Sequence, residues 1–136
     1  MSFKKYAALA AVAALTLAGC ASAPAAEPTA AGSDLKICVY THGDGGSFWS
    51  VAQKGAEAAA ADLGVELDYQ GSTNDAAKQA STIEAGVAAG CDGIAASAPD
   101  PEAIKSAMLA ADAAGIPTVT MNSGSAVFKT LGAFTH

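Results

Sequence analysis

The sequence predicts an α/β fold built on a doubly wound parallel sheet. Short apolar runs rich in strand-forming residues alternate with longer segments in which apolar residues recur every three or four positions. The runs begin near residues 35, 65, 93 and 117, so each strand–helix unit takes roughly 25–30 residues, about one βα unit. This alternation predicts parallel strands with helices on both faces, and right-handed crossovers favour a Rossmann-like strand order such as 2-1-3-4.

The first unit consists of a strand over 35–41 and a helix over 48–63. The run LKICVYT is nearly continuous in apolar residues, which is typical of a strand buried on both faces. Ser47 is expected to cap the start of the helix, and Gly64 is expected to end it. The apolar face of this helix carries Phe48, Val51 or Ala52, Gly55, Ala56, Ala59 and Leu63.

The later units repeat this pattern. Further strands are expected over 65–69, 93–98 and 117–121, with a fifth beginning within 130–135. The second helix is expected over 74–89, with Asn74 as its N-cap and Gly90 at its end. The third helix begins at Asp100-Pro101-Glu102, because Asp caps the first turn and Pro lacks the N–H that would be unpaired there. Gly115 ends this helix.

Residues 1–33 are expected to be a leader and a tether. Two lysines precede a twelve-residue apolar stretch, Ala7 to Ala18, which is too short to span a bilayer of about 30 Å and is typical of a signal peptide. The stretch ends in Leu17-Ala18-Gly19-Cys20, which resembles a bacterial lipobox, with a plain secretory signal as the alternative. We therefore expect a signal peptide over 1–20, a flexible Ala/Pro/Ser/Thr-rich tether over 21–33 and a folded domain over 34–136.

Composition excludes several classes of protein. Hydrophobic residues make up 51% and charged residues 15% of the chain, which argues against intrinsic disorder. The net charge is −6 and no arginine is present, so the chain is not expected to bind nucleic acid. No Cys or His spacing matches a metal site, and we expect neither a metal nor a cofactor.

Cys38 and Cys91 are the two cysteines that remain once Cys20 is assigned to lipidation. Export would permit a disulfide between them. Both lie in or beside expected strands with apolar neighbours, where a free cysteine packs as a small hydrophobic residue. We therefore favour two free cysteines, while their pairing remains an open alternative.

Three segments follow expected strands, where ligands bind in sheets of this type: 42–49, 98–100 and 122–124. The first is rich in glycine, but position 48 is Phe where the dinucleotide fingerprint needs Gly, and no P-loop lysine follows. Phe48 and Trp49 could instead cover the apolar face of a sugar or similar solute, or could simply pack at the helix start. Asp100 can cap its helix and also accept a hydroxyl hydrogen bond, and Asn122 can bind a hydroxyl or hold the turn.

No convincing catalytic constellation accompanies these segments. His42 has only Asp44 nearby in the sequence to orient it, and no G-x-S-x-G sequence or nucleophile–base pair is evident. We therefore expect a binding protein rather than an enzyme, with a flavodoxin-like enzyme as the more distant alternative.

The sequence from about 35 to 136 resembles the substrate-binding lipoproteins of bacterial ABC importers, which have the type I periplasmic-binding fold, and is similar to their ribose-binding group. The segments that carry this resemblance are Gly46-Ser47-Phe48-Trp49, Gln53-Lys54-Gly55-Ala56-Glu57, Cys91-Asp92-Gly93-Ile94, Pro99-Asp100, Ala114-Gly115-Ile116-Pro117 and Met121-Asn122-Ser123-Gly124. The lipobox supports the same family independently.

The resemblance implies that Phe48 and Trp49 stack on a sugar and that Asp100 bonds to its hydroxyls. The predicted ligand-binding residues are completed by Asn122, Ser123, His42 and Asp44, which lie in the segments that follow expected strands. Two departures make ribose itself doubtful. Gly46 stands where relatives have Asn, and Asn122-Ser123 stands where ribose binders have Asp-Arg. A related sugar, a polyol or a nucleoside remains open.

The resemblance further implies an exported monomeric receptor that passes its ligand to an ABC importer permease. Lipid on Cys20 would hold it at the outer face of the cytoplasmic membrane or in the periplasm. Family members have two lobes, so we expect this chain to be the incomplete N-terminal lobe of a longer protein.

Overall fold

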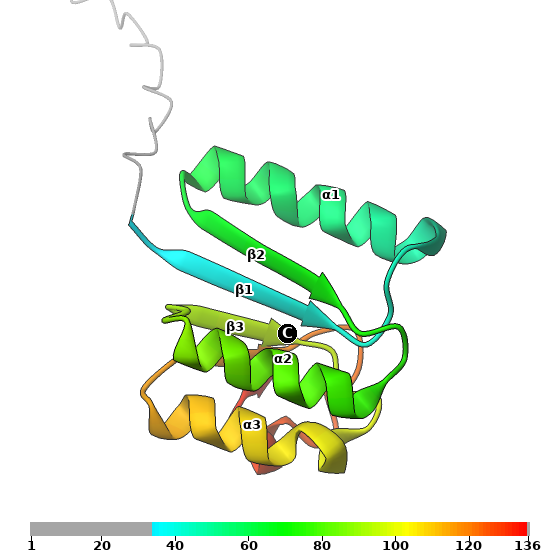
Figure 1. Ribbon diagram of the computed structural model, residues 1–136, viewed down its shortest axis with the longest axis vertical. Coiled ribbons are helices and arrows are strands. Elements are labelled where there is room, and N and C mark those ends of the chain that lie inside the picture. Colours follow the sequence, from blue (N-terminus) through cyan, green and yellow to red (C-terminus); the bar gives the residue numbers. More distant parts are fainter. Residues whose placement is uncertain (1–33, 136) are drawn as a thin grey trace, which may run out of the picture.

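The computed structural model describes residues 34–135, which form one five-stranded parallel sheet with the order β2-β1-β3-β4-β5 (Figure 1). The expected 2-1-3-4 order is confirmed, and the fifth strand adds to its β4 edge. The elements in chain order are β1 (Lys36–Thr41), α1 (Gly46–Leu63), β2 (Glu66–Gly71), α2 (Ala76–Ala88), β3 (Gly93–Ala96), α3 (Pro101–Ala113), β4 (Thr118–Thr120), the 3-10 helix η1 (Phe128–Leu131) and β5 (Phe134–Thr135).

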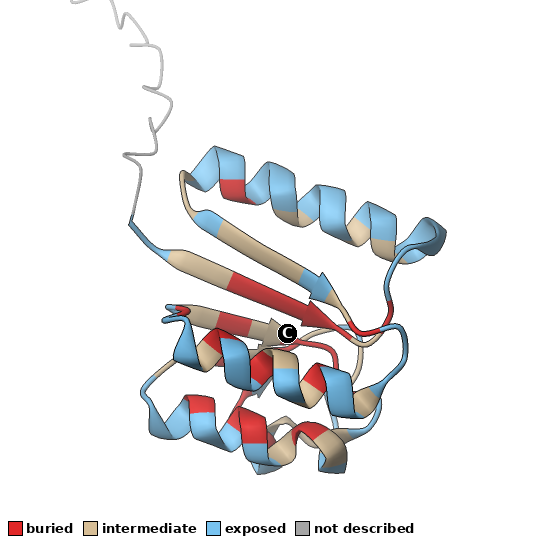
Figure 2. Cartoon of the chain, viewed as in Figure 1, coloured by how far each residue is buried: buried red, intermediate tan, exposed pale blue. Residues whose placement is uncertain are grey.

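The helices cover the two faces of the sheet unequally. Figure 1 shows α1 on one side of the strands and α2 beside α3 on the other. The buried core lies on the α2–α3 side, where Tyr40 and Ile94 meet Ile83, Ile104 and Met108. Figure 2 shows mostly exposed residues along α1, and its single buried residue is Ala60. The small side chains of α1 therefore bury much less apolar area than those of α2 and α3.

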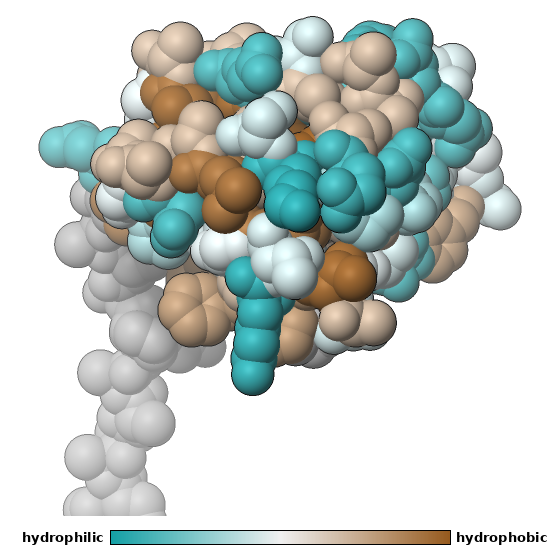
Figure 3. Space-filling model, turned by 90° about the horizontal axis from the view of Figure 1, so that it is seen from below, coloured by the Kyte–Doolittle hydropathy of each residue, from teal (hydrophilic) through white to brown (hydrophobic). Residues whose placement is uncertain are grey.

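On the α1 side, an open apolar depression of about 280 Å³ lies over β3, β4 and β5. Ile37, Ala95 and Val119 form part of its floor, and Phe134, at its margin, is 71% exposed. On the face seen from below relative to Figure 1, Figure 3 shows hydrophobic residues interrupted by hydrophilic ones. Within residues 34–135, no helix combines the length and apolar character needed to cross a bilayer.

Two expected helix caps are wrong. The residue before α1 is Gly45 rather than Ser47, and no side chain caps this helix. Gly45 and Gly46 both have φ near +60°, a backbone that only glycine adopts easily, so the helix begins two residues early and Ser47 falls within its first turn. Asp75, not Asn74, caps α2 by accepting a 2.9 Å hydrogen bond from the backbone N–H of Lys78.

The expected end of α1 at Gly64 and the expected cap of α3 at Asp100 are confirmed. Gly64 closes α1 in the left-handed conformation, with φ of 67°. Asp100 accepts a 3.3 Å hydrogen bond from the backbone N–H of Ala103, and Pro101 occupies the first turn of α3. Most strands keep their expected positions, but the fifth is confined to Phe134–Thr135, because η1 occupies the preceding residues.

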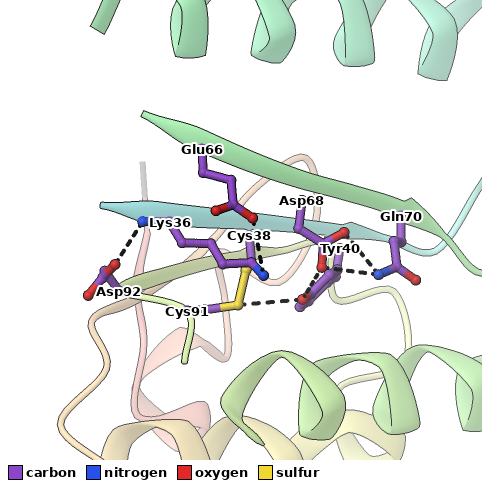
Figure 4. The surroundings of a disulfide bond; sticks show 8 residues. All are labelled: Lys36, Cys38, Tyr40, Glu66, Asp68, Gln70, Cys91 and Asp92. Atoms are coloured by element: carbon purple, nitrogen blue, oxygen red, sulfur yellow. Dashed lines mark hydrogen bonds and ion pairs between the residues drawn. A yellow bond between two sulfur atoms is a disulfide. The ribbon is translucent and has the colours of Figure 1, made fainter. Parts of the chain in front are cut away.

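Cys38 and Cys91 form a disulfide, which corrects the preference for two free cysteines (Figure 4). Cys38 pairs in register with Ile94 of β3, and Cys91 lies three residues before Ile94, in the turn that leaves α2. The two Cα atoms are 6.0 Å apart, and both side chains are buried. The apolar surroundings of both cysteines were correctly inferred, but such surroundings accommodate a buried disulfide as well as a buried thiol.

Tyr40 lies beside this disulfide and is also buried. Its hydroxyl donates a 2.8 Å hydrogen bond to the Asp68 carboxylate and lies 3.6 Å from Cys91 Sγ (Figure 4). Burial, followed by the hydrogen bond and negative charge of Asp68, raises the pKa of the Tyr40 hydroxyl well above its usual value. Tyr40 therefore stays neutral and fixes β1 to its neighbour β2.

Candidate functional site

The loops that follow β1 to β4 are joined to one another at the carboxyl edge of the sheet. Between the first two, the backbone N–H of Asn74 donates to the His42 carbonyl oxygen at 2.6 Å. Ser72 also bonds to the Thr41 carbonyl oxygen, through its backbone N–H at 3.0 Å and its hydroxyl at 2.7 Å. At the other end, the Ala98 N–H donates to Ser123 Oγ at 2.9 Å. These bonds hold the loops as one frame.

His42 joins the first loop to the third through Ser97. Ser97 Oγ lies 2.8 Å from both the backbone nitrogen and Nδ1 of His42. The backbone N–H donates to Oγ, so the hydroxyl has its own hydrogen available for Nδ1, and a neutral ring then carries its hydrogen on Nε2. Burial lowers the pKa of His42, which favours this neutral form.

This Ser–His pair has the spacing of a nucleophile and its base, but it is not arranged for catalysis. Ser97 is completely buried, with 0% exposure, so a substrate carbonyl cannot approach its hydroxyl. The pair instead connects two loops. Within residues 34–135, no cluster of three or more His, Cys, Asp or Glu side chains is placed to hold a metal ion.

Trp49 is the centre of an aromatic group at the start of α1. Its ring meets His42 edge-on at 5.0 Å between centroids and meets Phe48 edge-on at 4.8 Å. The indole also lies against Gly43, where a Cβ atom would collide with the ring. Trp49 is thus held on one side by the first loop, while Phe48 is 59% exposed. The arrangement offers apolar ring surface beside the polar edge.

A cavity of about 370 Å³ opens at this edge, between the loops and the starts of α2 and α3. His42, Asn74, Ala76, Gln79, Pro99 and Asp100 line it. The cavity thus brings together His42 and Asp100, which come from different loops. Asp100 uses Oδ1 to cap α3, so its second carboxylate oxygen remains available as an acceptor.

The other proposed site residues lie outside this lining. Asp44 is exposed and accepts a 2.9 Å hydrogen bond from the Thr73 hydroxyl. Asn122 is exposed, with φ of 62°, and Ser123 is occupied by the Ala98 N–H. Phe48 and Trp49 flank the edge from α1 without lining the cavity.

Asn74 and Gln79 line the cavity but were missed as site residues. Asn74 was interpreted as a helix cap, although its position in the loop between a strand and the next helix also predicts the carboxyl edge. Gln79 lies one helical turn before Ile83 on the buried face of α2, and it is only 1% exposed. A polar residue at a core-facing helical position was the available signal.

Comparisons with known proteins agree with this architecture. Residues 37–131 match the family model described as a periplasmic binding protein domain. A search of the curated proteins gives no match. The solved structures include many matches, of which three with more than 30% identity are described next.

A carbohydrate transporter from Acidothermus cellulolyticus 11B, in complex with myo-inositol, is 43% identical, with a TM-score of 0.69 over 74% of this chain and 35% of its own. AraP, an arabinose-binding protein from Geobacillus stearothermophilus, is 35% identical, with a TM-score of 0.61; the match covers 67% of this chain and 32% of AraP. LsrB from Clostridium saccharobutylicum, in complex with AI-2, is 31% identical, with a TM-score of 0.60; the match covers 63% of this chain and 27% of LsrB.

The matched region spans about a third or less of the length of these proteins. The family match nevertheless covers most of the residues described here, and it includes β1 to β4 and the loops of the carboxyl edge. The chain therefore belongs to the periplasmic binding protein family, whose members are solute receptors for transport.

Proposed function

We propose that this chain is part of an extracytoplasmic receptor that captures a sugar or cyclic polyol for an ABC importer. The observation that carries this proposal is the juxtaposition at the carboxyl edge of Trp49 ring surface with the cavity lined by His42 and Asp100. A ring of carbons bearing hydroxyl groups presents both an apolar face and a polar rim. It therefore complements the two parts of this edge.

Each part has a distinct role in this proposal. Trp49 covers the apolar face of the ring, while Phe48 supports the indole from its side. The free oxygen of Asp100 accepts a ligand hydroxyl, and His42 Nε2 donates to another. The remaining wall of the binding site would come from the part of the longer receptors that this chain does not match.

A cyclic polyol is the first ligand to test. The 43% identical carbohydrate transporter is described in complex with myo-inositol. The carboxyl edge offers acceptors and a neutral donor, and the Asp-Arg pair of ribose binders is replaced by Asn122-Ser123. A nucleoside would also use an aromatic surface, and it is included in the experiment as the competing ligand.

The experiment is a thermal-shift screen of the full-length mature protein, followed by calorimetry. The compounds are myo-inositol, D-ribose, L-arabinose, D-glucose and adenosine. A ligand at one hundred times its Kd should stabilise the protein by about 2.7 kcal/mol. Stabilisation by adenosine alone would favour the nucleoside receptor, and no response to any compound would refute the proposed ligand class.

Variants then locate the site. Trp49→Ala should weaken binding about fivefold, because aromatic stacking contributes on the order of 1 kcal/mol. Asp100→Asn keeps an oxygen for capping but weakens a charged hydrogen bond, so affinity should fall by roughly tenfold to a hundredfold. Asp112→Asn makes the same charge change near the other end of α3 and should leave binding unchanged. Wild-type affinity in both edge variants would place the ligand elsewhere.

The proposal also includes export and anchoring, which depend on residues outside those the structure describes. Cys20 would be lipidated, and the receptor would deliver its ligand to a membrane permease. Membrane fractionation of wild type and Cys20→Ala tests the anchor. The variant should be released into the soluble fraction, and unchanged membrane association would contradict lipidation at Cys20.

A further inference from the structure

Gln79 forms a buried connection between α2 and the ends of β1 and β3. Its side chain donates from Nε2 to the Tyr40 carbonyl oxygen at 3.2 Å and to the Ser97 carbonyl oxygen at 2.7 Å. Both partners can only accept hydrogen bonds, so they fix which end of the amide faces the sheet. The two hydrogens of Nε2 are thereby committed to the two strands.

The point that Gln79 holds is where β1 and β3 separate into their loops. The β1–β3 register ends at Tyr40 and Ala96, and the next bond runs from the Ser97 N–H to the Tyr40 carbonyl oxygen at 3.2 Å. His42 follows Tyr40 by two residues, and Asp100 follows Ser97 by three. A change in the distance between the ends of β1 and β3 at Gln79 would therefore move both loops that line the cavity.

We propose that Gln79 is the positioning residue of the carboxyl edge, which sets the distance between the His42 loop and the Asp100 loop. This inference rests on the proposed function, in which these two loops hold the ligand. Gln79 also borders the cavity, but its side chain is only 1% exposed and both Nε2 hydrogens bind the strands, so we assign its effect to the positions of the two loops. Ser97 is central, because its carbonyl oxygen binds Gln79 while its hydroxyl binds His42.

The chemistry of the site explains why this residue is a glutamine. Methionine has a similar length and volume but leaves the Ser97 carbonyl oxygen without its short hydrogen bond. An ionised glutamate has only acceptors and would repel both carbonyl oxygens. A protonated glutamate carries one O–H donor and can restore one of the two bonds. Gln79→Met and Gln79→Glu therefore separate hydrogen bonding from packing.

Ile83 supplies the matched control. It lies one helical turn after Gln79 in α2 and is completely buried in the core. Ile83→Val reduces packing under the same helix without removing any bond to the loops. Comparison of the two positions distinguishes an effect on the carboxyl edge from a general loss of stability.

The first measurement needs no ligand. Trp49 is the only tryptophan of the chain, and its ring contacts His42, so its fluorescence reports the position of the first loop. At a temperature where all variants are folded, we expect Gln79→Met to shift the Trp49 emission to longer wavelength. Ile83→Val should retain the wild-type spectrum.

The second measurement is the Kd for myo-inositol in the full-length mature protein. Gln79→Met should raise Kd by about tenfold or more, because a buried hydrogen-bond network is broken and the loops are displaced. Gln79→Glu should bind poorly at pH 7.5 and should recover, relative to wild type at each pH, as the solution is acidified. Ile83→Val should bind within about twofold of wild type.

The outcomes separate the two proposals. If wild type binds none of the compounds tested, the proposed function fails, while the fluorescence comparison still decides the role of Gln79. If Gln79→Met and Ile83→Val have the same spectrum, and any measurable affinities are also equal, Gln79 is a packing residue only and the inference is overturned. Failure of Gln79→Met to fold would leave the pH recovery of Gln79→Glu to decide the question.

Discussion

Reduction of the Cys38–Cys91 disulfide should destabilise the protein by about 4 kcal/mol. The two cysteines are 53 residues apart in the sequence, so the bond closes a long loop in the unfolded chain. In the chain-entropy description, a loop of this length lowers the entropy of the unfolded state enough to give about 4 kcal/mol at 25 °C. The ratio of folded to unfolded protein should therefore fall about a thousandfold on reduction.

The measurement is urea unfolding, followed by Trp49 fluorescence, with and without a thiol reductant. Reduction should lower the midpoint and also raise the dependence on urea, because an unfolded chain without the cross-link exposes more surface. The oxidised protein should be two hydrogen atoms lighter by mass spectrometry. This mass difference verifies that the bond is present before its effect is measured.

The double variant Cys38→Ala/Cys91→Ala serves as the control for the reductant. It should unfold at the same urea concentration with and without reductant, near or below the midpoint of the reduced wild type. Equal midpoints for oxidised and reduced wild type, with the bond verified by mass, would refute the entropic reasoning. Absence of the mass difference in protein from an oxidising compartment would refute the disulfide itself.

Three other predictions concern stability. Burial lowers the pKa of His42 below its unfolded value near 6.5, so the unfolded state takes up the proton first as the pH falls. The free energy of unfolding should therefore decline below about pH 6.5, and it should decline less steeply in His42→Gln, which urea unfolding at pH 7.5 and pH 5 would test. Gly86→Ala should cost about 1–3 kcal/mol because its methyl group would collide with Tyr40, whereas Gly55→Ala, on the open side of α1, should stabilise by about 0.5–1 kcal/mol; matching melting temperatures would contradict this contrast. Asp75→Ala should lower the free energy of unfolding by about 0.5–2 kcal/mol by removing the α2 cap, and Ser47→Ala should change it little. If chemical unfolding shows a larger loss for Ser47→Ala, Ser47 caps α1 after all.

Features that follow from local rules were predictable from the sequence. The alternation of strands and helices gave the sheet order, because crossover handedness leaves few arrangements. Gly64 and Asp100 mark helix ends through properties of single residues and were correctly assigned. Ser47 failed as a cap because the preceding glycine pair, with φ near +60° at both residues, allows the helix to begin earlier. The presence of two glycines does not by itself reveal that both adopt a positive φ.

Features that depend on neighbours in space were harder to predict. The pairing of Cys38 with Cys91 requires that β1 lie next to β3 and that the turn after α2 approach Cys38. The strand order was predicted, but the position of that turn was not. The core-facing position of Gln79 was a signal that this residue is unusual, but its two partners are backbone carbonyl groups, so the residue types did not reveal what it binds. The roles of Trp49 and Asp100 in binding remain predictions.

Much of the frame at the carboxyl edge is made from main-chain atoms. Bonds such as that from the Asn74 N–H to the His42 carbonyl oxygen do not depend on which side chains project outward. The side chains of Trp49, Asp100 and Asn122 make none of these bonds, so these residues can change while the frame remains, provided that residue 100 can still accept the Ala103 N–H at the start of α3. Under the proposed function, in which these residues face the ligand, single substitutions at the edge would change ligand preference without a new fold. A library that varies these three positions and preserves Gln79 and Ser97 would be the economical route to altered receptors.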